Sequence, residues 1–217
     1  MNFLPLPGGT FFMGESDADK FANDTERPRR EVTIPPGVEI AIDPVTVGEF
    51  RAFAPAHSPA EADDLPVTDV SWQDASDFAA WFSNELGAPC RLPTEAEWEY
   101  ACRAGTTTAF ACGNELPLSA ANYLYSEHGE RIGVGAKTPV GTYPANAFGL
   151  RDMHGNVCEW VADRWRPAYD KDAVGSLRVI RGGAWDYLPR LLRSSWRDAL
   201  PETTRRDNLG FRLARED

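Results

Sequence analysis

The spacing of apolar positions predicts three helices in the first half of the chain. Between residues 72 and 86, apolar side chains recur at the helical period of 3.6 residues, and Gly87 follows as a residue typical of helix ends. Two shorter segments, which we expect to end near residues 53 and 103, begin with the same signal, a hydroxyl residue three positions before an acid. The three capping boxes are Thr46–Glu49, Ser71–Asp74 and Thr94–Glu97.

Alternation of polar and apolar residues predicts short strands near the N-terminus. The strand-like segments are residues 10–13, 31–34 and 38–42. A Pro-Pro-Gly sequence at 35–37 separates the last two, which is typical of a hairpin or of a sheet edge.

Residues 105–150 have a different character. They are rich in Gly, Pro, Asn and Thr and show little periodicity, but they contain aromatic side chains that are too apolar to be left in water. We therefore expect a long, ordered loop region within one α+β domain that covers residues 1–217.

The charge and the apolar content exclude several classes of protein. The 217 residues are 42% hydrophobic, which is enough for one sizeable core, and a net charge of −11 would repel a polyanion, so no nucleic acid is expected as a partner. No run of 18 apolar residues exists that could span a membrane. Because residues 1–7 lack the features of a signal peptide, we expect a protein that is cytoplasmic as given. Nothing in the sequence demands more than a monomer, so a monomer is expected. Surface display would require a leader or a fusion.

The four cysteines form no known metal or redox motif. Cys90, Cys102, Cys112 and Cys158 are separated by 12, 10 and 46 positions, so no C-x-x-C pair is present. We expect them to be small apolar core residues. A Cys102–Cys112 disulfide stays open as an alternative.

Four separated motifs lie in order along about residues 3–215, namely Gly8–Gly14, Arg91–Tyr100, Gly155–Trp160, and a C-terminal one composed of Arg181–Arg197 and Asn208–Leu213. Together these motifs resemble the formylglycine-generating enzyme (sulfatase-modifying factor) family. The resemblance implies a C-type-lectin-like fold with much coil, short strands and about three helices. In active family members, two cysteines after a Gly-Gly pair bind copper and carry out an oxidation, and motif spacing places Tyr187 and Leu192 there in this chain.

The loss of both cysteines changes what the resemblance implies. Copper(I) strongly prefers soft thiolate ligands. Tyr187 cannot replace a thiolate, and Leu192 cannot coordinate a metal at all. The scaffold is therefore implied, whereas copper and formylglycine-generating activity are not expected.

The C-terminal segment, residues 184–208, lines the substrate groove in active relatives and is rich in Tyr, Trp and Leu here. Exposed together, these residues would form an interaction surface, and the alternative is that they are core residues. Leu191 and Leu192 cannot both point inward on a regular strand, so we expect at least one at the surface. The expected ligand-contacting residues are Asp186, Tyr187, Leu188, Arg190, Leu191, Trp196, Asp198, Ala199, Leu200, Thr203 and Arg205.

The chain also resembles the variable proteins of diversity-generating retroelements, which use this scaffold and vary residues in this segment between fixed framework positions. The sequence thus predicts a non-catalytic domain that binds an unknown protein or small molecule through residues 184–208, with retroelement diversification as the specific version. A cysteine-less oxidative tailoring enzyme and a regulatory pseudo-enzyme of the same family stay open. No catalytic residue is predicted.

The family resemblance implies a structural calcium site as well. Its ligands would be the carboxylates of Asp152 and Glu159 and the backbone carbonyls of Gly155 and Val157. Calcium takes about six to eight hard oxygen ligands, and two carboxylates with a glycine between them can wrap one ion; the alternative is that both carboxylates cap turns. A second family site begins at Asn122, but its usual downstream acid is missing, so we do not expect it.

Overall fold

The computed structural model describes residues 1–15 and 19–216, and it confirms the three predicted helices. At the start of each helix the predicted hydroxyl accepts a hydrogen bond from the backbone N–H three residues on, and the acid side chain accepts one from the cap. The longest helix ends at Gly87, whose φ of 71° is left-handed. The helices are α1 (Val47–Phe53), α2 (Trp72–Leu86) and α3 (Glu95–Arg103).

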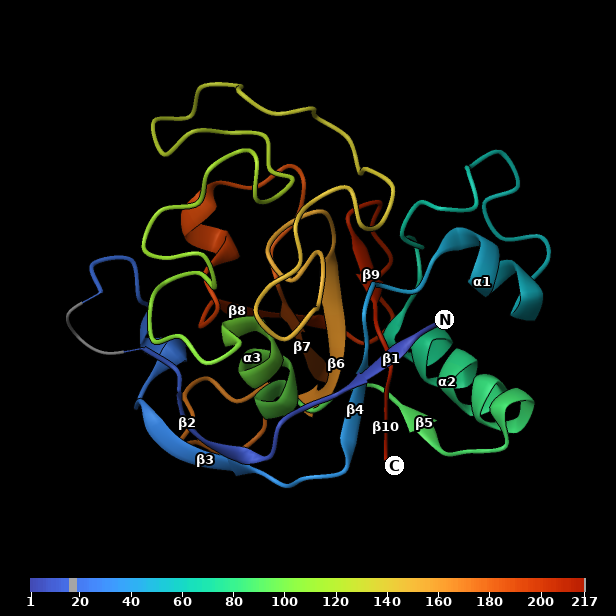
Figure 1. Cartoon of the computed structure of the whole chain (residues 1–217), viewed down its shortest axis with the longest axis horizontal. Helices are drawn as coiled ribbons and strands as arrows, with labels where there is room; N and C mark the ends of the chain where they lie inside the picture. The colour runs from blue at the N-terminus through green and yellow to red at the C-terminus, as the bar shows by residue number, and fades with distance from the viewer. Residues whose placement is uncertain (16–18, 217) are drawn as a thin grey trace.

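A four-stranded sheet brings the two ends of the chain together. Its order is β1-β4-β10-β5, and β4 pairs antiparallel with both the first and the last strand of the chain (Figure 1). The two termini therefore belong to the same layer. The strands are β1 (Phe3–Pro5), β4 (Val38–Ala41), β5 (Cys90–Arg91) and β10 (Ala214–Glu216).

The hairpin predicted around residues 35–37 does not form. β3 (Arg30–Ile34) pairs with β2 (Gly9–Met13) in a separate two-stranded sheet, whereas β4 joins the four-stranded sheet. The Pro-Pro-Gly sequence instead carries the chain from β3, an edge strand of its two-stranded sheet, to β4, which lies between β1 and β10 in the other sheet.

A second four-stranded sheet carries the C-terminal motifs. Its order is β8-β7-β6-β9, with β6 and β9 parallel. The segment between β7 and β8 contains the short 3-10 helix η2 (Pro189–Leu192), and another, η1 (Asp24–Glu26), lies near the N-terminus. The strands are β6 (Cys158–Arg164), β7 (Leu177–Arg181), β8 (Arg197–Pro201) and β9 (Leu209–Phe211).

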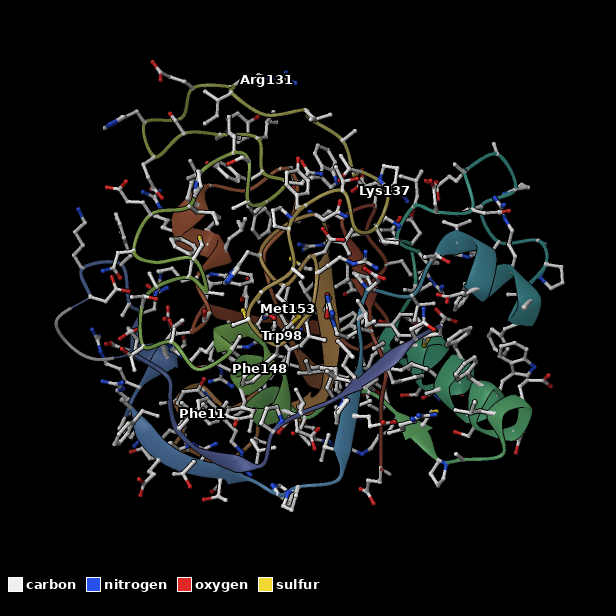
Figure 2. The ribbon with its side chains drawn as sticks, in the orientation of Figure 1. Phe11, Trp98, Arg131, Lys137, Phe148 and Met153 are labelled. Atoms are coloured by element: carbon white, nitrogen blue, oxygen red, sulfur yellow. The ribbon has the colours of Figure 1, made fainter. Side chains whose placement is uncertain are left out.

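Residues 105–150 form the predicted ordered loop region. They contain no helix or strand, only isolated bridges such as that between Tyr125 and Arg131, and they cover the upper left of the molecule in Figure 1. In Figure 2, Arg131 marks the outer part of this region, whereas Lys137 lies further inside, where its ammonium pairs with Glu61 at 2.7 Å. No helix in the described part of the chain is long and apolar enough to cross a membrane.

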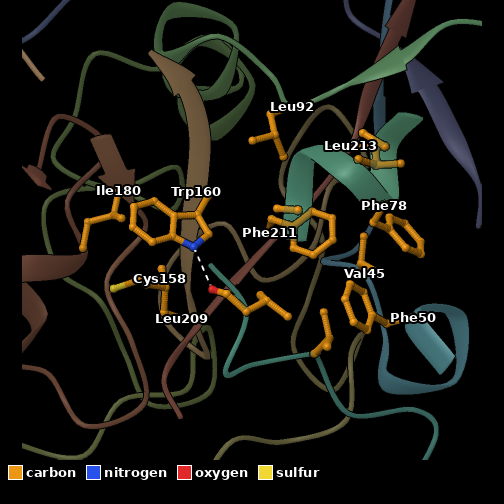
Figure 3. Packing of buried hydrophobic residues seen from close by; sticks show 14 of the residues in the cluster. Val45, Phe50, Phe78, Leu92, Cys158, Trp160, Ile180, Leu209, Phe211 and Leu213 are labelled. Carbon is orange, nitrogen blue, oxygen red and sulfur yellow. Dashed lines mark hydrogen bonds between the residues drawn. The ribbon is translucent and has the colours of Figure 1, made fainter. Parts of the chain in front are cut away.

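The core is built on aromatic packing between helices and sheet. The ring of Phe78 in α2 lies 5.3 Å from that of Phe50 in α1 and 5.5 Å from that of Phe211 in β9 (Figure 3). Trp160 is fully buried in the same cluster, and its indole N–H donates to the carbonyl of Val70 at 3.0 Å. This packing fixes the sheet from which the C-terminal segment leaves.

Candidate ligand-binding site

The C-terminal segment leaves its sheet at the end of β7 through two glycines. Gly182 and Gly183 have φ values of 91° and 68°, a left-handed conformation that favours glycine. A Cβ on Gly183 would also lie 2.6 Å from the carbonyl oxygen of Leu191. The segment then runs as a loop, a 3-10 helix and a second loop before it re-enters the sheet as β8, so it is not the regular strand considered from the sequence.

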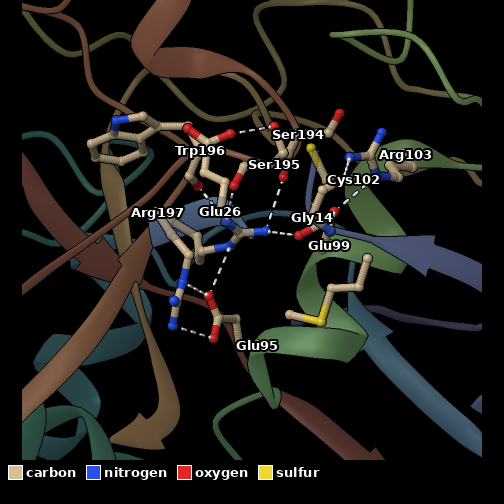
Figure 4. A network of polar contacts seen from close by, with 12 residues as sticks. Gly14, Glu26, Glu95, Glu99, Cys102, Arg103, Ser194, Ser195, Trp196 and Arg197 are labelled. Atoms are coloured by element: carbon tan, nitrogen blue, oxygen red, sulfur yellow. Dashed lines mark hydrogen bonds and ion pairs between the residues drawn. The ribbon is translucent and has the colours of Figure 1, made fainter. Parts of the chain in front are cut away.

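Buried arginine–glutamate pairs hold this segment in place. Arg193, which is 2% exposed, donates from both Nη atoms to the two carboxylate oxygens of Glu26 at 2.7 Å. Arg197 forms a similar two-point pair with Glu95, at 2.6 and 2.9 Å, as Figure 4 shows. Arg181 donates to the backbone carbonyls at positions 194 and 195. These guanidinium groups tie loops together, so they are not available to bind a ligand.

Two of the eleven predicted ligand-contacting residues are core residues. Trp196 is 4% exposed and Leu200 is 9% exposed, and both belong to the cluster around Phe78. The half-buried Tyr187 packs edge-on against Trp196, with ring centroids 5.8 Å apart. The predicted surface is therefore wrong at these two positions, because their side chains close the core beneath the segment. The nine others, all at least partly exposed, are Asp186, Tyr187, Leu188, Arg190, Leu191, Asp198, Ala199, Thr203 and Arg205.

Leu192, at the position of a cysteine in active relatives, is completely buried. The two adjacent leucines lie in η2, where successive side chains point about 120° apart, and this turns Leu192 inward and leaves Leu191 half-buried. Two glycines make room for it: a Cβ on Gly155 or Gly183 would lie 2.8 or 2.7 Å from its methyl groups. Packing alone accounts for a leucine at this place.

The thiols of the chain are not activated. All four cysteines are free, and three are buried as expected, whereas Cys112 is exposed and is not bonded to Cys102. Burial raises the pKa of the Cys102 thiol to about 12, and burial raises the pKa of the Cys158 thiol well above its usual value. At neutral pH these buried groups are thiols and not thiolates, and the thiolate is the form that binds metals.

The predicted calcium ligands do not fit a cation in the observed arrangement. Both carboxylate oxygens of Glu159 accept hydrogen bonds from Arg212 at 2.8 Å, and one also accepts the indole N–H of Trp98 at 2.8 Å. Its charge is therefore already matched by a buried guanidinium. Asp152 accepts the backbone N–H of Gly141 at 3.0 Å, and burial raises the pKa of its carboxyl to about 6. Calcium stays a prediction that requires Glu159 to leave Arg212.

At the second family site, the side-chain amide of Asn122 is already used in hydrogen bonds. The Asn122 side-chain amide donates to the carbonyl of Ala136 at 2.9 Å and to the side-chain oxygen of Asn156 at 3.2 Å. Across residues 1–15 and 19–216, no group of three His, Cys, Asp or Glu side chains is arranged to hold a metal ion.

A cleft of about 970 Å³ opens beside η2, and sequence analysis missed it. Four segments that lie far apart in the sequence form its walls and gather on the left of Figure 1: residues 15 and 19–21, 107–116, 127–128 and 189–193. The backbone N–H of Arg190 donates to Glu127 at 2.7 Å, which joins two of these walls. Apolar floor residues include Phe21, Phe110 and Leu116. No periodicity in the sequence links the residues that line the cleft. The one signal in the sequence was an aromatic residue within a polar loop, such as Phe110.

Comparison with known proteins gives a single family. The model of the family described as "Sulfatase-modifying factor enzyme 1-like domain" matches residues 2–217. The inactive C-alpha-formylglycine-generating enzyme 2 of Mus musculus is 30% identical over 96% of this chain and 84% of its own length. The hercynine oxygenase of Mycolicibacterium smegmatis is 30% identical over 96% of this chain and 60% of its own length. A serine/threonine-protein kinase, pkn1 of Chlamydia caviae, is 38% identical over 69% of this chain, but the match spans only 24% of that relative.

Solved structures confirm the predicted α+β, C-type-lectin-like fold. PvdO from Pseudomonas aeruginosa superposes with a TM-score of 0.87 and 32% identity, over 99% of this chain and 94% of that chain. The Treponema denticola variable protein 1 superposes with a TM-score of 0.80 over 99% of this chain and 95% of that chain. At 22% identity the second likeness concerns the fold alone.

Proposed function

We propose, from the premise that this chain belongs to the sulfatase-modifying factor enzyme 1-like family, that it is a non-catalytic ligand-binding domain. Its site would be the cleft beside η2 together with the exposed residues of the segment 184–208. One observation carries the proposal: the segment that holds Tyr187 and Leu192 in place of two thiols also forms a wall of a large cleft. A cleft of this volume is typical of small-molecule sites.

The division of the segment into buried and exposed positions supports this function. Arg193 and Arg197 are paired below the surface, whereas side chains such as Asp198, Thr203 and Arg205 are exposed. Exposed positions of this kind can change without disturbing the buried pairs. This is what a retroelement-diversified protein requires, and the likeness to the Treponema variable protein is compatible with it at the level of fold. An imperfect template repeat of the DNA for residues 180–213, beside a reverse transcriptase gene, would establish that version, and its absence would remove it.

An enzymatic function is the second candidate, because one relative is named hercynine oxygenase. In the cysteine-less tailoring version, the cleft would hold a small molecule or peptide during an oxidation. Turnover of a ligand found to bind the cleft, measured by mass spectrometry under oxygen, would decide for this version. One relative is named as an inactive enzyme, which supports a third hypothesis, that this chain is a regulatory pseudo-enzyme. This hypothesis requires the chain to change the reaction rate of an active family member.

A thermal-shift screen tests the binding function directly. The probes are a library of small amines, carboxylic acids, sugars and short peptides, and a compound at a hundredfold excess over its Kd stabilises the folded chain by about 2.7 kcal/mol. We expect compounds that raise the Tm of the native chain to lose this effect in Phe21→Ala. The matched control is Leu86→Ala, an exposed apolar residue at the end of α2, on the opposite side in Figure 1. No stabilising compound, or equal shifts in both variants, would overturn the proposal.

A further inference from the structure

We propose that the cleft beside η2 selects an uncharged ligand that has an apolar body and a hydrogen-bond acceptor, such as the oxygen of an amide. This inference rests on the proposed function and adds the chemical class of the ligand. It follows from the ion pairs that already match the charges of the cleft, from the oriented side-chain amide of Asn114, and from the apolar floor.

Ion pairs within the protein match the charges of three carboxylates in the cleft wall. Among the Asp, Glu, Lys and Arg side chains that line the cleft, only Glu115 and Lys20 form no ion pair in the part of the chain that the structure describes. Both are exposed, and an ion pair at an exposed position contributes little to binding. The three pairs are Asp19–Arg193 at 3.0 Å, Glu127–Arg190 at 3.5 Å and Glu15–Arg103 at 3.7 Å.

A charged ligand would gain little from this arrangement. Its charge would lose part of its hydration on entering the cleft, and a charge that is buried without a partner is costly. To obtain a well-placed partner, the ligand would have to break an existing pair, such as that of Arg190 with Glu127, whose carboxylate also accepts the backbone N–H of Arg190 at 2.7 Å. An uncharged ligand avoids both costs.

The side chain of Asn114 provides an uncharged hydrogen-bond donor in the cleft wall. Its oxygen accepts the backbone N–H of Ala109 at 3.2 Å, and this bond sets the orientation of the amide. The NH2 group of Asn114 donates no hydrogen bond to residues 1–15 or 19–216. Because an amide nitrogen has two N–H groups, it can donate to an oxygen of the ligand without disturbing the loop.

The floor of the cleft fits an apolar body. Phe110 and Leu116 are buried and belong to a hydrophobic cluster that also contains Leu192, so the floor is rigid. Pro189 adds apolar surface from the wall formed by η2. Burial of apolar surface stabilises a complex roughly in proportion to the area removed from water, so this floor would supply affinity, whereas Asn114 would orient the ligand.

Three fluorescent probes of similar size test the inference. Near neutral pH, dansylglycinamide is uncharged, dansylglycine carries a carboxylate, and dansylethylenediamine carries an ammonium group. We expect the uncharged probe to bind at least about threefold more tightly than either charged probe in a fluorescence titration, because neither charge finds a free, well-placed partner. The titration uses physiological ionic strength, where the net charge of −11 is screened beyond about 8 Å.

Two variants connect this preference to particular side chains. Asn114→Asp keeps the acceptor for the N–H of Ala109 but replaces the NH2 donor with a charge, so it should weaken the uncharged probe and strengthen the ammonium probe, each by about two- to fivefold. Glu127→Gln keeps an oxygen for the backbone N–H of Arg190 but frees the guanidinium, so the carboxylate probe should bind about two- to fivefold more tightly. Glu85→Gln, the control at the exposed end of α2, should change none of the three affinities.

The outcomes separate this inference from the proposed function. A charged probe that binds as tightly as the uncharged one, and whose affinity a cleft variant changes, would overturn the uncharged class and keep the cleft as a site. Binding of the uncharged probe that Asn114→Asp leaves unchanged would overturn the inference. If no probe binds, the compounds from the thermal-shift screen decide: uncharged compounds that Asn114→Asp weakens support the inference, and charged compounds alone overturn it. Failure of both experiments would remove the site itself.

Discussion

Replacing Arg193 with methionine should be strongly destabilising, although no charged ligand or metal is involved. The methionine keeps most of the volume of the side chain but leaves the buried carboxylate of Glu26 without its partner. It also removes hydrogen bonds to the backbone carbonyls of Phe21 and Arg190. Breaking a buried ion pair from one side costs about 3–5 kcal/mol. In a chain of this length each kcal/mol lowers Tm by about 2–4 °C, so the Tm should fall by about 6–20 °C.

Urea unfolding and calorimetry of three variants measure this effect. Arg190→Met is the matched control, since Arg190 is 41% exposed, its pair with Glu127 is screened by solvent, and its loss should cost about 0–1 kcal/mol. Arg193→Met combined with Glu26→Gln should recover part of the loss, because the uncompensated charge is gone. The reasoning is refuted if Arg193→Met costs no more than Arg190→Met. In that case the N-terminal loop would not depend on this pair.

Three further predictions concern the core, the carboxyl of Asp152 and the calcium hypothesis. Trp196→Ala should lower the free energy of unfolding, measured in urea, by about 3–5 kcal/mol, as expected for a core aromatic residue. The control Thr203→Ala, at an exposed position, should change it by no more than about 0.5 kcal/mol. A small effect of Trp196→Ala would mean that the Trp196 side chain lies at the surface. Burial raises the pKa of Asp152 to about 6, so the folded state favours the protonated form, and this contribution to stability is lost as pH rises through about 6. Asp152→Asn should therefore be more stable than the native chain at pH 8, by at most about 3 kcal/mol, and no more stable near pH 4. The pairing of Glu159 with Arg212 predicts that chelation with EDTA leaves the Tm of the native chain unchanged, whereas the calcium site predicted from the sequence requires a lower Tm. A lower Tm on chelation, together with a lower Tm of Asp152→Asn at pH 8, would establish calcium as a ligand of these carboxylates.

Short-range signals in the sequence were sufficient for the helices and the family. A capping box involves residues three positions apart, and its hydrogen bonds form wherever the segment folds, so Thr46, Ser71 and Thr94 mark three helix starts correctly. The four motifs, in their order along the chain, identify the fold because their residues make many long-range contacts. The sequence alone also shows Tyr187 and Leu192 where the motif spacing predicts the two cysteines.

Burial and pairing in the C-terminal segment were decided only by the tertiary structure. Whether Trp196 lies inside or outside depends on what Tyr187 and the distant helices place over it, and no local pattern reports that. Glu159 has the sequence position of a metal ligand, but Arg212, brought beside it by the pairing of β6 with β9, takes its charge. The cleft is a further case, since four segments without common periodicity form it. The sequence by itself determined the scaffold and the absence of two cysteines from the C-terminal segment. Packing between distant segments decided which side chains face solvent, which charges are matched and where a ligand can lie.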